Sequence, residues 1–402
     1  MNLPPLDVLG PLIPGPVPRR RLDDAVDAAL ARLGGPAEDL TVLVNDPQRH
    51  TDSRAVLESL ARHVDLTRLR LLVACGSHRF APAAREAFAR ALAGEWRLQR
   101  PLWHDAYAED LAPIGQGEHR WRAHPWLAQA GPLLAIGSVE PHYFAGLTGA
   151  HKTATIGGAS YDDIQANHAH ALGSLPRPCR LEGNPIFEGV RRMLQALEAR
   201  RPVAAINLIQ AGRDIAAAAG GTALEALGAL AGPCERCFVR RIDQPADALV
   251  VQAEGVLGRS FYQADKAIKN SEWALRDGGV IVLEAPCTDG IGQDDFVRLL
   301  RAAATYQKAK DLVDRQGYRL GDHKAVRLRY LTDPACRGVR IYAVTPGLSP
   351  ADAAVLGFTQ AESAEQALVL AGIVPGRDRV YRVRDAGNVC VIVSSPSWPV
   401  AT

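Results

Sequence analysis

The sequence contains no run of about 18 or more apolar residues, so we expect no membrane-spanning helix. It also lacks an excess of charge of either sign, because 46 lysine and arginine residues face 44 aspartate and glutamate residues. The arginines are scattered and form no basic stripe, so nucleic acid is not an expected partner. The first residues carry neither the charged start nor the apolar block of a signal peptide.

Cysteine is sparse and irregularly placed. Seven cysteines, an odd number, do not make the framework of a disulfide-stabilised protein, which predicts a reducing, cytoplasmic location. Cys234 and Cys237 form a single Cys-x-x-Cys pair, and no second pair completes a tetrahedral zinc site. We therefore expect two ordinary thiols near a domain junction.

Lysine is the scarcest charged residue, with six lysines against forty arginines. A lysine that persists against such a bias is a candidate for amine chemistry. Lys152 is the first lysine in the chain and Lys266 is the second. The histidines are also unevenly placed, since all eleven except His323 lie between His50 and His170. This clustering indicates a site without naming its chemistry.

The length and the apolar content predict two globular domains, because 402 residues with 47% hydrophobic side chains exceed one ordinary core. We place the domains at residues 1–238 and 239–385, with the crossover near residues 232–244. Whether residues 386–402 complete the first domain is left open. Both domains are expected to be α/β.

Short apolar runs alternate with segments of helical periodicity, and strand followed by helix, repeated, indicates mainly parallel, Rossmann-like sheets. The Ala-rich segment 215–231 is predicted to be helical, and residues 380–394 contain strand-like runs. The other predicted strands are residues 40–44, 69–74, 133–136, 203–209, 248–251, 279–284 and 339–344. The other predicted helices are residues 23–33, 53–63, 82–93, 184–198, 265–275 and 296–304.

Polar side chains follow the first two predicted strands, where ligands bind in open parallel sheets. Asp46 and Arg49 could hold a hydroxyl group and an anion, or could form a turn with a surface salt bridge. His78 follows Gly76 and Ser77 and is a candidate general base, or a hydrogen-bonded structural residue. His104 beside Asp105 is interpreted as ordinary loop structure.

A glycine-rich segment over residues 140–168 carries His142, Lys152 and His168. Small residues let the backbone approach a ligand closely, and successive amides can cradle an anion. The spacing fits neither the usual zinc signatures nor a phosphate-binding P-loop. The segment therefore indicates an anion site with a nucleophilic lysine and an imidazole ligand. The alternative is a connection with hydrogen-bonded histidines.

Gln263 and Lys266 lie three residues apart at a predicted helix start, where they share one face. They could clamp a substrate carboxylate, and a solvated helix face is the alternative.

Taken together, residues 40–344 resemble the lactate racemase family. The resemblance lies in the order and spacing of several motifs rather than in any one of them. These are Pro141-His142, Lys152, Asn167-His168, the Tyr262-Gln263-x-x-Lys266 element and the Cys287-x-x-Gly290-x-Gly292 turn.

The resemblance implies a racemase or epimerase of a 2-hydroxy acid, with the active site in the cleft between the domains. The reaction would proceed by reversible hydride transfer from C2 to a nickel-pincer nucleotide, nickel pyridinium-3,5-bisthiocarboxylic acid mononucleotide, which other enzymes of the cell build. The N-terminal domain would bind this cofactor and the C-terminal domain would contribute substrate-binding residues. The implied roles are cofactor attachment by Lys152, nickel ligation by His168, proton transfer by His78 and His142, cofactor contacts by Asp46 and Arg49, and substrate binding by Gln263, Lys266 and Arg49.

Two motifs depart from the family pattern. Asp46-Pro47-Gln48-Arg49-His50 lacks the expected Thr before the arginine and Pro after it, and Gly149-Ala150-His151-Lys152 replaces part of a Gly-Gly pair. These changes leave the substrate open among lactate, another 2-hydroxy acid and a sugar acid. The number of subunits is not predicted.

Two other functions remain as alternatives. One is a nicotinamide-dependent oxidoreductase, although no G-x-G-x-x-G follows the first strand. The other is an inactive protein that binds the cofactor or a hydroxy acid, which would need Lys152 but not both His78 and His142.

Overall fold

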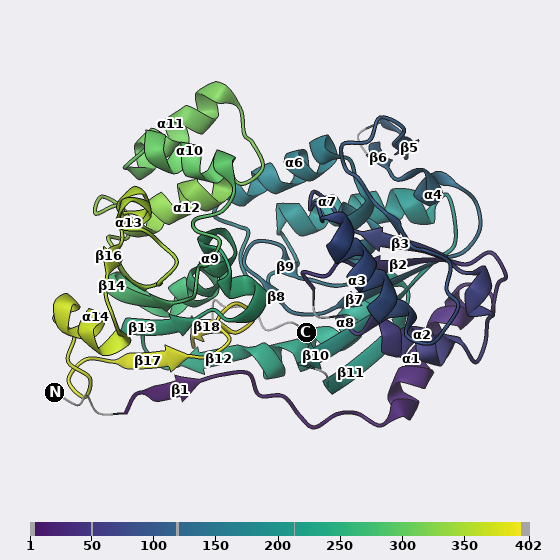
Figure 1. Ribbon diagram of the computed structural model, residues 1–402, viewed down its shortest axis with the longest axis horizontal. Coiled ribbons are helices and arrows are strands. Elements are labelled where there is room, and N and C mark those ends of the chain that lie inside the picture. The colour runs from purple at the N-terminus through teal and green to yellow at the C-terminus, as the bar shows by residue number, and fades with distance from the viewer. Residues whose placement is uncertain (1–4, 50, 118–119, 213, 395–402) are drawn as a thin grey trace.

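The computed structural model describes residues 5–49, 51–117, 120–212 and 214–394, so His50 and the last part of the segment 386–402 lie outside the described residues. Figure 1 shows two α/β halves side by side, each built on its own sheet. The predicted fold class is thereby confirmed. Every strand predicted between residues 40 and 344 is present, with its ends shifted by a few residues.

The N-terminal half contains a six-stranded sheet that is parallel except at one edge. In spatial order its strands are β11 (Asp214–Gly221), β10 (Val203–Ala211), β7 (Leu133–Ser138), β2 (Thr41–Asn45), β3 (Arg70–Ala74) and β4 (Leu102–Trp103).

Helices cover both faces of this sheet, because successive strand side chains point to opposite sides. Val42 and Val44 pack with helices α1 and α2, whereas Leu43 packs with α5 and α7 on the other face. The helices of this half are α1 (Arg19–Arg32), α2 (Ser53–Leu60), α3 (Pro82–Ala93), α4 (Pro125–Ala128), α5 (Ala150–Ala154), α6 (Tyr161–Ala169), α7 (Pro185–Glu198) and α8 (Ala223–Phe238). Two small hairpins, β5 (Ala112–Ile114) with β6 (Trp121–Ala123) and β8 (Pro141–His142) with β9 (Gly146–Leu147), lie beside it.

The C-terminal half contains an all-parallel six-stranded sheet. Its strands, in spatial order, are β1 (Asp7–Leu9), β17 (Val380–Val383), β13 (Ala246–Gln252), β14 (Leu275–Glu284), β15 (Arg340–Val344) and β16 (Thr359–Gln360). Leu249 and Val251 pack toward α9 and α10, whereas Val250 packs toward α14. Its helices are α9 (Phe261–Ser271), α10 (Asp294–Ala302), α11 (Tyr306–Gln316), α12 (Asp322–Thr332), α13 (Pro350–Leu356) and α14 (Ala364–Ala371).

The chain passes between the halves at both of its ends. Strand β1 adds to the C-terminal sheet, far from the helix α1 that follows it (Figure 1). Near the other end, β18 (Cys390–Val393) pairs in parallel with β12 (Val239–Ile242). Helix α8 ends at Phe238, and we retain the division between residues 238 and 239 as a proposal.

The prediction of a helix over residues 215–231 is wrong for its first part. Residues Asp214–Gly221 form β11, which pairs antiparallel with β10, and α8 begins only after Thr222 caps it. The small side chains serve close packing here, because a Cβ at Gly220 would lie 1.8 Å from the carbonyl oxygen of Ala25 in α1. Tertiary contact therefore outweighs the helical propensity of alanine.

In the part of the chain that the structure describes, no helix has the length and apolar character needed to cross a membrane.

We expect Gly137→Ala in β7 to lower the free energy of unfolding by about 1–3 kcal/mol, because the added methyl group would force the backbones of β7 and α5 apart. A Cβ at Gly137 would lie 2.4 Å from the backbone nitrogen of Ala150, where α5 begins. Gly228→Ala in α8 is the control: nothing lies within 4 Å of its Cβ, and we expect stabilisation by about 0.5–1 kcal/mol. Urea unfolding measures both, and equal stability of the two variants would contradict the packing argument.

Candidate active site

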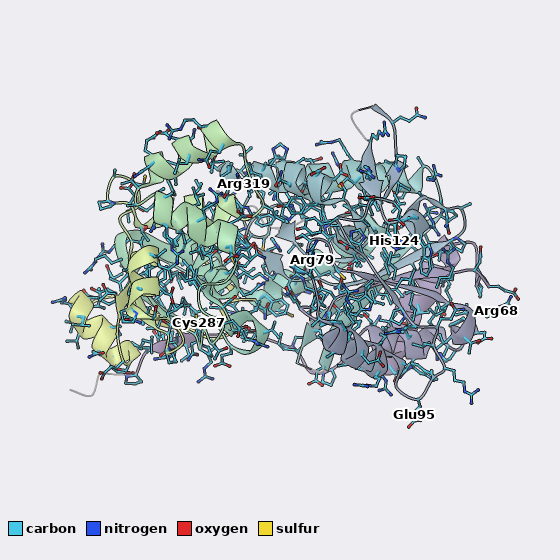
Figure 2. The ribbon with its side chains drawn as sticks, turned by 45° about the horizontal axis from the view of Figure 1, so that its top comes forward. Arg68, Arg79, Glu95, His124, Cys287 and Arg319 are labelled. Atoms are coloured by element: carbon cyan, nitrogen blue, oxygen red, sulfur yellow. The ribbon has the colours of Figure 1, made fainter. Side chains whose placement is uncertain are left out.

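A cavity lies between the two halves and encloses about 1090 Å³ of space not filled by protein, part of it open to solvent. In Figure 2, Arg79, the residue after His78, and Arg319 lie near the junction of the halves, whereas Arg68 and Glu95 lie at the far end of the N-terminal half. The structure brings every candidate residue into this cavity wall. They are Asp46, Arg49, His78, His142, Lys152, His168, Gln263 and Lys266.

Helix α5 presents Lys152 to the cavity through contacts made by its neighbours. The backbone N–H of Ala150 donates to Asn207 Oδ1 at 2.8 Å, which satisfies a donor of the first turn. Thr153 Oγ1 donates to Asn45 Oδ1 at 2.7 Å and so ties the helix to the end of β2. Gly149 precedes the helix at φ 150°, where its missing side chain leaves room for the His151 ring. Lys152 therefore projects from a rigid base.

The Lys152 amine is held in a cationic, enclosed environment. Desolvation, followed by the nearby Arg49 guanidinium, lowers its pKa from 10.5 to about 7. A large share of the amine is therefore uncharged at neutral pH, which makes it available as a nucleophile.

His78 and Asp46 form a hydrogen-bonded pair at the ends of neighbouring strands. His78 Nδ1 lies 2.8 Å from Asp46 Oδ2, and Asp46 Oδ1 accepts the backbone N–H of Gln48 at 2.8 Å. Since a carboxylate accepts, the neutral tautomer carries its proton on Nδ1 and its lone pair on Nε2. His78 is therefore arranged as a base.

His142 is buried and has a different arrangement. It lies on β8 in the short hairpin with β9, and its Nδ1 accepts the backbone N–H of Ala145 at 3.2 Å. The proton of the neutral ring is then on Nε2. Desolvation and the nearby positive charge of Lys152 hold the pKa of His142 well below 6.5, so the ring is neutral.

His168, on α6, has no hydrogen-bond partner for Nδ1 among the described residues. Burial, followed by the positive charge of Lys152, lowers its pKa to about 3, so the ring is neutral and able to act as a ligand. Within the described ranges, no three or more His, Cys, Asp or Glu side chains gather closely enough to hold a metal ion by themselves.

Helix α9 contributes Gln263 and Lys266 from the C-terminal half. The turn from Cys287 to Gly292 fixes its start, because the N–H groups of Phe261 and Tyr262 donate to carbonyl oxygens of that turn at 3.0 and 2.8 Å. Across the cavity, Arg49 lies 3.8 Å from the Glu140 carboxylate. Desolvation, followed by Arg49, holds the pKa of Lys266 well below 10.5, so a bound anion would stabilise its charge.

The cavity is also lined by residues that were not singled out from the sequence, among them Tyr143, Phe144, His323 and Lys324. His323 was the one histidine outside the cluster, and Lys324 one of six lysines, but neither lay in a recognised motif. Lys324 Nζ lies 3.8 Å from Asp265 and donates to the carbonyl oxygen of Tyr262.

Other candidates lie away from the cavity. Cys234 and Cys237 are free and buried in an apolar cluster that also contains Cys179 and Cys390. Buried His104 lies with Nε2 2.9 Å from the carbonyl oxygen of Ala159.

The fold and the site define a two-part α/β enzyme in which an amine and several imidazoles share one interdomain cavity. Two family models match the chain, the lactate racemase N-terminal domain over residues 19–176 and the lactate racemase C-terminal domain over residues 242–393. The chain belongs to the lactate racemase family and is an isomerase of the racemase class.

Curated relatives agree with this assignment. The lactate racemase of Thermoanaerobacterium thermosaccharolyticum is 27% identical over 79% of this chain and 74% of its own length. That of Lactiplantibacillus plantarum is 25% identical over 69% of this chain and 67% of its own.

Two solved structures share the fold. The lactate racemase apoprotein of T. thermosaccharolyticum superposes with a TM-score of 0.80 at 23% identity, over 96% of this chain and 94% of its own. A Thermotoga maritima protein gives a TM-score of 0.70 at 15% identity, over 95% and 100%.

The lowered pKa of Lys152 has a measurable consequence in protein made without any cofactor. We expect its amine to become reactive toward trace acetic anhydride around pH 7, because the neutral form exists above its pKa of about 7. Lys310, which is exposed and paired with Asp314, serves as the control, and the midpoint of its reactivity profile should lie above pH 10 because its pKa is raised. Peptide mass spectrometry across the pH range measures both, and coincident profiles would show that the pKa of Lys152 is not lowered.

Proposed function

We propose that the protein interconverts the two configurations at C2 of a 2-hydroxy acid, lactate or a related acid, with a nickel-pincer nucleotide attached to Lys152. The observation that carries the proposal is the convergence of all eight candidate residues, from both halves, on one cavity. The relatives named as lactate racemases support the reaction class.

The residues fit this cofactor. A nucleophilic amine on Lys152 and a neutral imidazole on His168 line the same cavity. A pincer group brings most of the metal's donor atoms itself, so a single imidazole suffices on the protein side. Lys152 would hold the group covalently, His168 would ligate nickel, and Asp46 and Arg49 would contact the nucleotide.

The C2 hydrogen of a 2-hydroxy acid is barely acidic, because a carboxylate is attached to the same carbon. When bound, the nucleotide would supply an electron-poor acceptor for this hydrogen and its electron pair. The protein must therefore move the hydroxyl proton. It must also keep the planar 2-oxo acid in place until its other face is presented.

Gln263 and Lys266 hold the carboxylate, with Arg49 on the opposite wall, so that the acid stays bound while it turns. His78 accepts the hydroxyl proton at Nε2, since Asp46 fixes the proton on Nδ1. His142 presents Nε2–H, because its Nδ1 is occupied by the Ala145 amide. The two imidazoles thus begin in different states: His78 can accept a proton, and neutral His142 donates a hydrogen bond from Nε2–H and can pass on a proton only after it has taken one up.

We also propose a cytoplasmic location, where the seven free thiols remain reduced and the enzymes that build the nucleotide can load it. The expected partners are those enzymes and a small hydroxy acid, and not nucleic acid. A nicotinamide-dependent oxidoreductase and an inactive binding protein are outcomes that the following experiments would reveal.

Lys152→Arg should abolish the mass adduct, the nickel content and the racemisation of protein produced together with the cofactor-building enzymes, because a guanidinium does not form the amide-like link. Lys310→Arg, on the exposed face of α11, should keep all three. Intact-mass spectrometry, metal analysis and chiral chromatography of the product measure them across a panel of 2-hydroxy acids.

Full activity of Lys152→Arg, or of protein made without those enzymes, would overturn the proposal. A substrate deuterated at C2 should yield product that retains deuterium. Complete replacement by solvent hydrogen would instead indicate proton abstraction.

Asp46→Asn should lower kcat by about a hundredfold to ten-thousandfold, because an amide donor facing Nδ1 moves the imidazole proton to Nε2. The matched control is Asp27→Asn, which alters a His–Asp pair at the surface, where His63 Nε2 lies 3.0 Å from Asp27. That variant should stay within about twofold of the parent, since a surface pair contributes little. Similar kcat values for both variants would show that His78 is not the base.

A further inference from the structure

Three buried or half-buried side chains form a hydrogen-bonded chain across the cavity. The hydroxyl of Tyr143, in the N-terminal half, lies 3.0 Å from His323 Nε2 in α12, across 180 residues of sequence. The hydroxyl of Tyr318 lies 2.7 Å from His323 Nδ1. A neutral imidazole donates from one nitrogen and accepts at the other, and a hydroxyl can do either, so both contacts are satisfied together.

This chain ends on the ring that supports His142. The His142 and Tyr143 rings stack, with centroids 5.2 Å apart and planes inclined by 14°. The Phe144 ring packs edge-on against both, at 4.4 Å from His142 and 4.6 Å from Tyr143, and also against His323 at 5.1 Å. The orientation of the Tyr143 ring therefore restricts the orientation of the His142 ring.

The Nε2 side of the His142 ring needs such support. The 3.2 Å hydrogen bond from the Ala145 amide to Nδ1 holds one side of the ring and leaves the ring able to swing about that bond. Tyr143 is 3% exposed and His323 is 2% exposed, so water does not compete for their contact. Lys324, the next residue of α12, packs against the same ring, because its Nζ lies 5.4 Å from the centroid of the Tyr143 ring.

We propose that His323 is a positioning residue: through Tyr143 it fixes the orientation of the His142 imidazole when the C-terminal half meets the N-terminal half. The inference rests on the function proposed above, because it assigns His142 a part in proton transfer. The orientation of His142, in the N-terminal half, then depends on a hydrogen bond that His323 supplies from the C-terminal half.

The two hydrogen bonds of His323 can be separated by substitution. The amide of Gln reaches about as far from the backbone as Nε2, and that of Asn about as far as Nδ1. His323→Gln therefore keeps the partner of Tyr143, and His323→Asn keeps only the partner of Tyr318. Tyr143→Phe and Tyr318→Phe form a second matched pair, since each removes one hydroxyl and retains the ring.

We expect His323→Asn and Tyr143→Phe to lower kcat about tenfold to a hundredfold, with KM changed by no more than about twofold, because a misplaced group weakens catalysis more than binding. His323→Gln and Tyr318→Phe should stay within about threefold of the parent. The double variant Tyr143→Phe with His323→Asn should be no slower than either single variant. All are measured on holoenzyme with matched nickel content and adduct mass.

Thermal unfolding separates positioning from folding. Equal kcat losses in His323→Gln and His323→Asn that follow their losses in Tm would overturn the proposal and leave His323 a structural residue. Additive losses in the double variant would overturn it as well. If instead His142→Ala turns over at the parent rate, the proposed function fails first, and that result is distinct from either outcome at His323.

Discussion

The close approach of α5 to β7 is the contact on which the rest of the site depends. Gly137 has no side chain where Ala150 begins the helix, and the Asn207 amide receives the first N–H. A larger residue on β7 would push the helix, and Lys152 with it, toward the cavity. The glycine and alanine content of this region therefore sets the position of the amine rather than its flexibility.

A second constraint is electrostatic. Arg49, Lys152, Lys266 and Lys324 line one cavity, whereas the carboxylates near it are already engaged: Asp46 with His78 and Glu140 with Arg49. Desolvation, followed by neighbouring positive charge, lowers the pKa of Lys152, Lys266, His142 and His168. The same positive charge favours an anionic ligand, so a carboxylate substrate and a phosphate-bearing cofactor would both relieve it. Reactivity of the amine and affinity for anions thus come from one arrangement.

Strand ends and helix starts could be read from the sequence, because apolar periodicity marks them locally. Asp46 and His78 were located in this way, as was the start of α9 with Gln263 and Lys266. The contact of Tyr143 with His323 could not be, since no local pattern connects residues 180 positions apart. Strand β11 was missed because Gly220 packs closely against α1, a tertiary contact that local propensity does not register.

The division of labour between the halves has a mechanistic consequence under the proposed function. The N-terminal half holds the proton-transferring imidazoles and the amine, and the C-terminal half holds Gln263 and Lys266. A carboxylate bound at α9 would therefore stabilise the arrangement in which α9 faces the imidazoles and α12 contacts Tyr143. Energy gained at the carboxylate, which does not itself react, is used to orient the groups that do. An acid whose carboxylate fits Gln263 and Lys266 poorly would lose turnover as well as affinity. Substrate choice therefore depends on the contact between the two halves.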